Sequence, residues 1–258
     1  MLPLANVLGV GVHAIDMNSA VDTIENAIAA RKQGYVCLTG VHGVMEAQRD
    51  PDLTTAFANA MLVLPDGMPT VWIGHLQGFH QMDRVFGPEL MLRIAERSVR
   101  RGYSHFLCGG QPGIAEQLRD ALVHRFPGIT ILGTYTPPFR SLTAAEEREL
   151  VSKIEELRPQ IVWVGMSTPR QELFMARYLP RLKTTLMIGV GAAFDFHIDK
   201  VRQAPRFLQR IGMEWFFRLC MEPKRLYKRY FEIVPLFILY NARELIKSLV
   251  TTTTKEVK

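Results

Sequence analysis

The sequence has few cysteines and no long hydrophobic run, and each shortage excludes a class of protein. The three cysteines, Cys37, Cys108 and Cys220, are widely spaced without a Cys-X-X-Cys pair, so neither a disulfide framework nor a zinc site is indicated. The longest apolar run near the C-terminus, residues 233–240, has eight residues, whereas a helix that crosses a bilayer needs about 20. We therefore expect a reducing compartment and only peripheral contact with any membrane.

Targeting signals are also absent from the sequence. No basic residue precedes the apolar N-terminal stretch, which argues against a signal peptide, and neither end carries a lipidation motif. With 48% hydrophobic and 22% charged residues, the 258-residue chain can bury a substantial core. We expect a cytoplasmic protein with one large α/β domain and a smaller addition.

Positive charge is concentrated in the last quarter of the chain. From Lys200 onward there are thirteen Lys and Arg against five acidic residues, a net of +8 compared with +6 for the whole sequence. Aromatic side chains lie between these charges, namely Phe207, Trp215, Phe216, Phe217, Tyr227 and Tyr230. Basic charge combined with apolar rings favours an anionic membrane surface over a purely ionic partner such as a nucleic acid. We expect the protein to be peripheral on the inner face of the cell membrane. We expect residues 201–258 to form a basic amphipathic helical C-terminal segment on a domain of residues 1–200.

Within the C-terminal segment, the spacing of charged residues predicts two helices. Four charged residues recur every fourth position and would share one face of a single helix: Arg206, Arg210, Glu214 and Arg218. Pro223 should end that helix and begin a second one, on which Arg225 and Arg229 repeat the spacing.

The first two hundred residues alternate short apolar runs with helical patterns. This alternation predicts an α/β fold with a Rossmann-like parallel sheet flanked by helices. Six strand candidates begin at Tyr35, Met61, Ser104, Thr130, Ile161 and Leu186. Helix ends are readable too: Pro88 and Gly102 bracket one helix, and Thr143 with Glu146 forms a capping box that opens another.

Ligands of an open parallel sheet bind beyond the carboxyl ends of its strands, and two such ends are unusual here. Asp66 and Gly67 follow the second predicted strand. Asp66 is interpreted either as an ordinary turn aspartate or as a functional carboxylate. Gly109 and Gly110 follow the third and open a helix whose N-terminus favours a phosphate. A tight turn without a ligand explains the glycines equally, since they match neither GxGxxG nor the P-loop.

Two further strand ends carry polar side chains. Gln171 and Glu172 follow Pro169 in the predicted first turn of a helix. They either lie near a ligand or, in the case of Glu172, interact favourably with the helix dipole. Thr39 and His42 follow the first long strand, and a lone histidine is more often structural than catalytic.

Taken together, motifs spread over nearly the whole chain resemble the WecG/TagA/CpsF family of glycosyltransferases. They occur in the order TGVHGVMEAQRDPDL, LVLPDG, RVFGPEL, FLCGGQPGIAE, VGMSTPRQE, IGVGAAFDF and APRFLQRIGMEWFFRLCMEPKRLYKRY. The resemblance implies a membrane-associated enzyme that moves a sugar from a UDP-linked donor to a polyprenyl-diphosphate-linked sugar in the synthesis of exopolysaccharide, capsule or teichoic acid.

The resemblance also implies roles for particular residues. Asp66 would be the catalytic base, and the nucleotide-sugar pocket would include Gly109, Gly110, Gln171 and Glu172. The C-terminal segment would close over that pocket and supply Arg218, Arg225 and Arg229 to the diphosphate. Many relatives have Thr-Pro-Asn after the first long strand, whereas this chain has Thr39-Gly40-Val41-His42, so Thr39 transfers and His42 stands in place of the asparagine as an acceptor contact.

The chemistry of the residues agrees with this assignment. A carboxylate can take the proton of a sugar hydroxyl as it attacks the anomeric carbon, and helix N-termini or arginines can stabilise the departing UDP. We expect an inverting single displacement with no metal or cofactor. Two alternatives stay open: an NAD-dependent oxidoreductase, although its usual strand-end acid is missing, and a non-catalytic membrane-docking module. The sequence also leaves open whether the protein forms a homo-oligomer.

Overall fold

The computed structural model describes the backbone of residues 2–256, with all side chains except those of Arg206, Arg210, Arg225, Arg229 and residues 248–256. Its main element is a six-stranded parallel sheet in the order β4-β3-β8-β7-β5-β6. The strands are β3 (Gly34–Thr39), β4 (Leu62–Pro65), β5 (Ser104–Gly109), β6 (Thr130–Tyr135), β7 (Ile161–Gly165) and β8 (Leu186–Gly189). All six predicted strands and the α/β class are confirmed.

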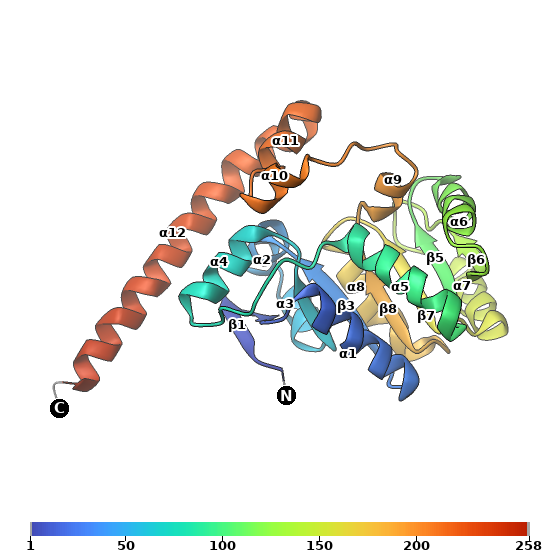
Figure 1. The fold of residues 1–258 in the computed structure, drawn as a ribbon, viewed down its shortest axis with the longest axis horizontal. Coiled ribbons are helices and arrows are strands. Elements are labelled where there is room, and N and C mark those ends of the chain that lie inside the picture. The colour runs from blue at the N-terminus through green and yellow to red at the C-terminus, as the bar shows by residue number, and fades with distance from the viewer. Residues whose placement is uncertain (1, 257–258) are drawn as a thin grey trace.

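Helices cover both faces of the sheet (Figure 1). Successive residues of β3 point to opposite sides, so that Val36 and Leu38 join one core cluster while Tyr35 and Cys37 join the other. The first cluster includes residues of α1 (Met17–Ala29), α5 (Gly87–Arg101), α6 (Ile114–Arg125) and α9 (Ala193–His197). The second includes residues of α2 (Val41–Ala47), α3 (Pro51–Ala58), α7 (Ala144–Leu157), α8 (Arg170–Tyr178) and the 3-10 turn η1 (Leu179–Arg181).

The predicted helix ends are also confirmed. Pro88 lies in the first turn of α5, and Gly102 ends that helix in the left-handed conformation with φ of 69°. Thr143 and Glu146 form the expected capping box at the start of α7. Pro169 immediately precedes α8.

An N-terminal hairpin was not anticipated from the sequence. It consists of β1 (Leu4–Val7) and β2 (Val10–His13), which pair antiparallel. Leu8 and Gly9 both have positive φ, as a two-residue hairpin turn requires. Alternate hairpin side chains are buried in the second core cluster beside β4, so the hairpin extends the covering of that face.

The C-terminal segment differs from the predicted arrangement in one respect. The single helix expected before Pro223 is two short ones, α10 (Arg206–Arg210) and α11 (Glu214–Met221). Gly212 between them has φ of 71° and packs against the ring of Trp72 in α4 (Met68–Leu76), where an added Cβ would lie 2.6 Å from a ring carbon. Because this contact turns the chain, the charged residues on either side of Gly212 do not share one helix face.

The last helix, α12 (Pro223–Glu256), starts at Pro223 as predicted and has 34 residues, about 51 Å at 1.5 Å per residue. It runs along one side of the molecule and extends beyond the sheet (Figure 1). Its side chains Ile233 and Phe237 are buried in the second core cluster, and the helix packs on α2. None of the described helices is both long and apolar enough to cross a bilayer.

Candidate functional site

The carboxyl ends of β3 and β4 bring the first group of predicted site residues together. Asp66 follows β4, and its amide donates a hydrogen bond of 2.9 Å to the carbonyl of Thr39, the last residue of β3. The side chain of Asp66 is half-buried, and its Oδ1 accepts a bond of 3.2 Å from the amide of Gly87 at the start of α5. The amide of Gly87 therefore orients the Asp66 carboxylate, and the carboxylate stays accessible.

Thr39 and His42 take different positions beside Asp66. Thr39 is buried, and Gly43 leaves room for its hydroxyl, because a Cβ at Gly43 would lie 2.2 Å from Thr39 Oγ1. His42 lies in the first turn of α2 with about a quarter of its side chain exposed, and its Nε2 is 3.7 Å from Glu46 Oε1. Thr39 ends β3 and His42 follows it, so both lie at the carboxyl end of the strand that neighbours β4.

Arg84 is the site residue that the sequence reasoning missed. It lies in the loop before α5, where its Nε donates a bond of 2.6 Å to the backbone carbonyl of Asp66. Its guanidinium lies over the ring of Phe86, with its central carbon 4.3 Å from the ring centroid. The motif RVFGPEL, quoted above as part of the family pattern, was the available signal.

The C-terminal segment reaches this group through α11. Arg218 lies over the ring of Phe196 in α9, 5.9 Å from its centroid, and that ring packs edge-on against Phe86. Arg218 Nε is buried without a hydrogen-bond partner among the described residues. The side chains of Arg225 and Arg229, the other two predicted diphosphate ligands, lie outside the described residues. We call Arg84, Phe86, Phe196 and Arg218 the arginine-phenylalanine cluster.

Gln171 and Glu172 lie at the centre of the same sheet edge and are fully buried. Gln171 Oε1 accepts a bond of 3.0 Å from the amide of Gly191 in the loop after β8, and its Nε2 donates to Glu172 Oε1 at 2.9 Å. Thr168 donates to the same oxygen at 3.0 Å, whereas Glu172 Oε2 has no partner among the described residues. Burial raises the pKa of the Glu172 carboxyl above its ordinary value despite these hydrogen bonds.

Gly109 and Gly110 mark the divergence of two helices. The connection after β5 runs outward through α6 on one face, and the connection after β7 runs inward through α8 on the other. This is the position at which open α/β sheets bind ligands. An added Cβ at Gly109 would lie 2.4 Å from the carbonyl oxygen of Gly165, and the amide of Gly110 donates to that oxygen. The glycines are thus required for strand packing and leave their edge open.

A pocket of about 430 Å³ lies next to Gly110. It is lined by residues 135–139, by Pro112 and by the carboxylates of Glu146 and Glu149. Phe139 is 81% exposed at its mouth and lies under the guanidinium of Arg170. The size suits a small ligand, and the mixture of rings and carboxylates suits one with a flat apolar part and hydroxyl groups.

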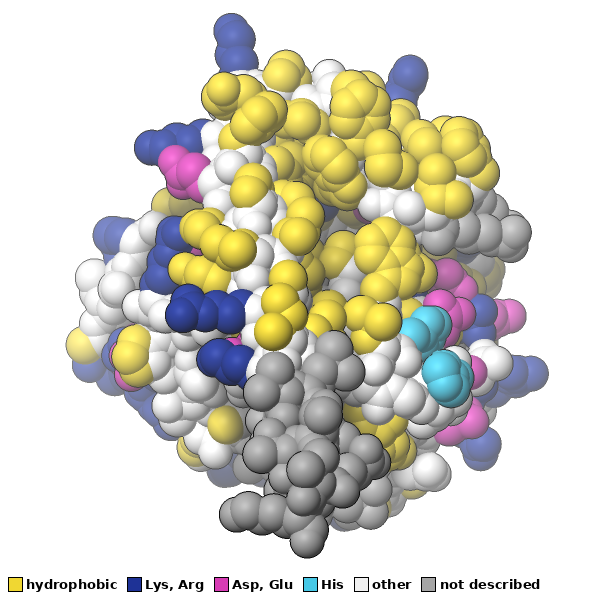
Figure 2. All heavy atoms as spheres, turned by 90° about the vertical axis from the view of Figure 1, so that its left-hand side faces the viewer, with side chains coloured by type: hydrophobic (Ala, Val, Ile, Leu, Met, Phe, Trp, Pro, Cys, Tyr) yellow, Lys and Arg dark blue, Asp and Glu magenta, His cyan; other side chains and the backbone are white. Residues whose placement is uncertain are grey.

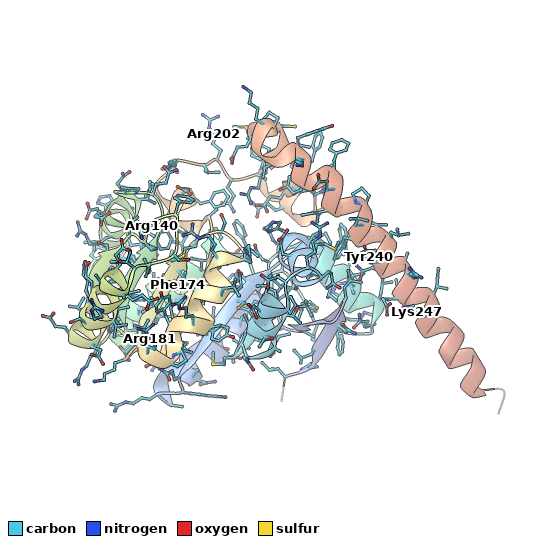
Figure 3. The ribbon with its side chains drawn as sticks, turned by 180° about the vertical axis from the view of Figure 1, so that it is seen from behind. Arg140, Phe174, Arg181, Arg202, Tyr240 and Lys247 are labelled. Carbon is cyan, nitrogen blue, oxygen red and sulfur yellow. The ribbon has the colours of Figure 1, made fainter. Side chains whose placement is uncertain are left out.

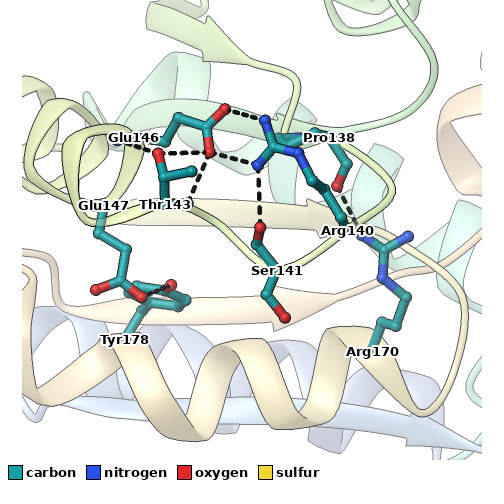
Figure 4. Close-up of polar contacts among 8 residues, drawn as sticks. All are labelled: Pro138, Arg140, Ser141, Thr143, Glu146, Glu147, Arg170 and Tyr178. Carbon is teal, nitrogen blue, oxygen red and sulfur yellow. Dashed lines mark hydrogen bonds and ion pairs between the residues drawn. The ribbon is translucent and has the colours of Figure 1, made fainter.

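The loop that forms the pocket wall is held by polar contacts at both ends (Figure 4). Arg140 makes two hydrogen bonds of 2.7 Å to the two oxygens of Glu146, and Arg170 donates to the carbonyl of Pro138 at 2.9 Å. The bond from Arg140 and that from the Thr143 amide lower the pKa of Glu146 to about 2. Glu146 is therefore ionised and occupied, which leaves Glu149 as the carboxylate available to a ligand.

The two ends of the candidate site are far apart along the sheet. Asp66 follows β4 at one edge, whereas Gly109 ends β5, four strand spacings away in the order of the sheet, or about 19 Å at the usual separation. Gln171 and Glu172 lie between them beside β8. The site residues predicted from sequence thus line one long edge rather than one compact pocket.

Comparison with known proteins identifies the fold that carries this edge. The glycosyl transferase WecG/TagA/CpsF family model matches residues 5–250. The chain belongs to this family. Two relatives, from Bacillus spizizenii and Bacillus subtilis, are each 26% identical over 81% of this chain and 80% of their own length. Both are named N-acetylglucosaminyldiphosphoundecaprenol N-acetyl-beta-D-mannosaminyltransferase.

Membership of the WecG/TagA/CpsF family confirms the resemblance inferred from the motifs. The protein is a glycosyltransferase. The oxidoreductase and the non-catalytic docking module are therefore set aside. The strand-end carboxylate, the arginine-phenylalanine cluster and the divergent helix pair can now be assigned roles in a transfer reaction.

Proposed function

We propose that this glycosyltransferase moves a sugar from a UDP-linked donor to a sugar carried on a polyprenyl diphosphate, as a step in cell-surface polysaccharide synthesis. The relatives' names describe transfer of an N-acetylhexosamine to such an acceptor. The observation that carries the proposal is the oriented carboxylate of Asp66 beside Arg84, with Arg218 on the same ring stack. This arrangement combines a candidate base and two cations at the β4 edge of the sheet.

Asp66 acts as the general base in this proposal. Its carboxylate takes the proton of the acceptor hydroxyl as the hydroxyl oxygen bonds to the anomeric carbon of the donor. The bond from that carbon to the diphosphate oxygen breaks, and its electron pair leaves on UDP. Arg84 and Arg218 stabilise the charge that develops on the diphosphate. One displacement inverts the anomeric configuration.

The nucleotide part of the donor lies toward β5 and β7. The N-terminus of α6 has no side-chain cap, so its backbone amides are available to the uridine end of the donor, whereas the diphosphate reaches toward Arg84 and Arg218. Gly110 directs its own amide to Gly165, which means that Gly109 and Gly110 act by leaving space rather than by donating. The pocket next to Gly110 takes the uridine, with Glu149 accepting from a ribose hydroxyl. Gln171 and Glu172 contribute to the donor site by holding the loop at Gly191 between the two ends.

The acceptor approaches from the side that carries the C-terminal segment. Hydrophobic side chains gather over that face (Figure 2), and they include Phe207, Ile211, Trp215, Phe216, Tyr227, Phe231, Ile238, Leu239 and Ile246, all exposed. Figure 3 places Tyr240 and Lys247 on α12, on the side opposite Arg140 and Arg181. Rings and basic residues on one helix suit the inner, anionic leaflet of the cell membrane, where the polyprenyl chain is anchored. On that side the partly exposed His42 faces the acceptor sugar, and the buried Thr39 supports the turn at Asp66 through its backbone carbonyl.

Asp66→Asn tests the assignment of the base. Loss of a general base typically costs about 100- to 10,000-fold in rate, so turnover of a UDP-linked sugar with a soluble acceptor analogue should fall by that factor. UDP affinity measured by calorimetry should stay within about twofold, because the base contacts the acceptor. The matched control is Asp120→Asn, at an exposed residue of α6 paired with Arg119, which should keep full activity. A wild-type rate in purified Asp66→Asn would show that another group takes the proton.

A further inference from the structure

The contact between α11 and the body of the protein centres on one guanidinium. Arg84 is bonded to the carbonyl of Asp66 and stacked on Phe86, and both contacts come from the body. Its two remaining nitrogens point to the C-terminal segment, Nη2 to Glu214 Oε2 at 2.5 Å and Nη1 to Gln209 Oε1 at 3.4 Å. The side chains of Arg84 and Glu214 are only 14% and 13% exposed, so this ion pair is largely shielded from water.

Glu214 occupies an unfavourable position for a carboxylate. Burial is the largest influence and raises its pKa, and the nearby charge of Asp66 raises it further, while Arg84 and Arg218 lower it. A second carboxylate beside a catalytic one brings like-charge repulsion. The chain places one there nonetheless, at the first residue of α11, where its only ion-pair partner among the described side chains is Arg84.

Arg218 follows Glu214 by four residues and so lies one turn along the same face of α11. The apolar contacts of this region, Gly212 on Trp72 and Trp215 on Tyr230, hold the segment against α4 and α12. The ion pair of Glu214 adds a polar contact, because it ties the face of α11 that also carries Arg218 to a guanidinium held by the body.

We propose that Glu214 is a positioning residue for transfer: by pairing with Arg84 it sets α11 so that the guanidinium of Arg218, whose buried Nε has no partner among the described residues, reaches the donor's diphosphate beside Asp66. This inference rests on the proposed function, which gives Arg84 and Arg218 a diphosphate to bind. It assigns Glu214 no contact with substrate. Its effect on the rate is exerted through Arg218.

A double-mutant cycle tests this relation in the full-length protein. Glu214→Gln keeps the size and one accepting oxygen but removes the charge that grips Arg84. We expect kcat/KM with a soluble acceptor analogue to fall by about 10- to 100-fold, as for a misplaced catalytic group. Arg218→Ala should cause a similar loss. In the Arg218→Ala background, Glu214→Gln should cost less than about twofold, since there is no longer an arginine to position.

Two measurements separate positioning from loss of fold. Glu232→Gln, at an exposed glutamate of α12, removes the same charge from the same segment and should leave kcat/KM unchanged. Hydrogen exchange of residues 214–221 should be faster in Glu214→Gln, with exchange of the sheet unaltered. Full activity of Glu214→Gln, or losses that multiply in the double variant, would overturn the proposal.

The cycle also distinguishes this inference from the proposed function. If the wild-type protein transfers no sugar from UDP-linked donors, the proposed function fails and the kinetic arm has no signal. The exchange arm then decides the structural part alone: faster exchange in residues 214–221 of Glu214→Gln supports the role of Glu214 in placing α11, and unchanged exchange refutes it.

Discussion

Replacing Glu172 by glutamine should stabilise the protein at neutral pH, which is the reverse of the usual effect of a substitution in a core. Glu172 is fully buried on α8, one of its oxygens accepts from Thr168 and Gln171, and the other has no partner among the described residues. Burial raises the pKa of this carboxyl above its ordinary value, because the charged form loses its hydration. Glutamine keeps an accepting oxygen and carries no charge.

The sign of the pH dependence follows from the direction of that shift. A carboxyl whose pKa is higher in the folded state binds its proton more tightly when folded, so its protonated form favours folding. That contribution is complete below the ordinary carboxyl pKa of about 4.3 and is lost as the pH rises through the raised pKa. Glu172→Gln should therefore match the wild type in Tm at the acidic end and exceed it at pH 8.

The gain arises from the charge on the unpartnered oxygen, because glutamine would place a neutral amide nitrogen there that is equally unpartnered. A buried polar group without a partner costs about 1–3 kcal/mol, and more when charged. For a chain of this length 1 kcal/mol shifts Tm by roughly 2–4 °C, so we expect an increase of about 5 °C at pH 8. Thermal unfolding should be followed from about pH 4, below the ordinary carboxyl pKa, to pH 8, with the exposed Glu156→Gln of α7 as control. A lower Tm at pH 8, or a difference that does not change with pH, would refute the reasoning.

The same variant tests the functional assignment of Glu172. If Glu172→Gln is more stable and transfers sugar poorly, the buried charge is kept at the expense of stability because the donor site needs it. If it is more stable and fully active, Glu172 has no part in binding the donor.

Two further predictions concern the glycine turn and the C-terminal segment. Gly109→Ala should lower Tm more than Gly110→Ala in thermal unfolding, because a Cβ at Gly109 would meet the backbone of Gly165, whereas one at Gly110 would meet the side chain of Ile114, 2.7 Å away; the reverse order would contradict the packing described above. In sedimentation with anionic vesicles, binding of the full chain should weaken at high salt. Binding should also weaken when Phe231→Asp is combined with Ile238→Asp, both exposed on α12, but not in the control Val123→Asp of α6. Unchanged binding of the double variant would exclude this face as the membrane contact.

The strands and helix ends were predictable because their determinants are local. A buried parallel strand is a short apolar run, and each of the six runs has that form in the sequence. The N-terminal hairpin escaped notice because its alternation spans four residues per strand with Leu8-Gly9 as the turn. The order of the strands could not be predicted in this way. β8 lies between β3 and β7, and no local sequence pattern specifies which strands pair with it.

The candidate site divides in the same way. Asp66 was found because it follows an apolar run directly, Gly109 because it ends one, and Glu172 because it lies in the first turn of the helix after one. Arg84 was missed because its ion-pair partner, Glu214, lies 130 positions further along the chain. The nearby contact with Phe86 did not by itself mark a site. The break between α10 and α11 was also missed, since it depends on Trp72, which meets Gly212 only in the folded protein.

The position of Asp66 at the edge of the sheet explains why the C-terminal segment belongs to the proposed site. β4 is an edge strand, with β3 on one side and, among the described residues, no further strand of this sheet on the other, where the hairpin strand β2 packs instead. The carboxylate at its end has Thr39 of β3 on one side and Arg84, with α10 and α11, on the other. An acceptor whose lipid tail stays in a membrane would approach past α10 and α11. The exposed apolar face of the C-terminal segment lies on that side, so the element that would meet the membrane is the one that completes the surroundings of the base.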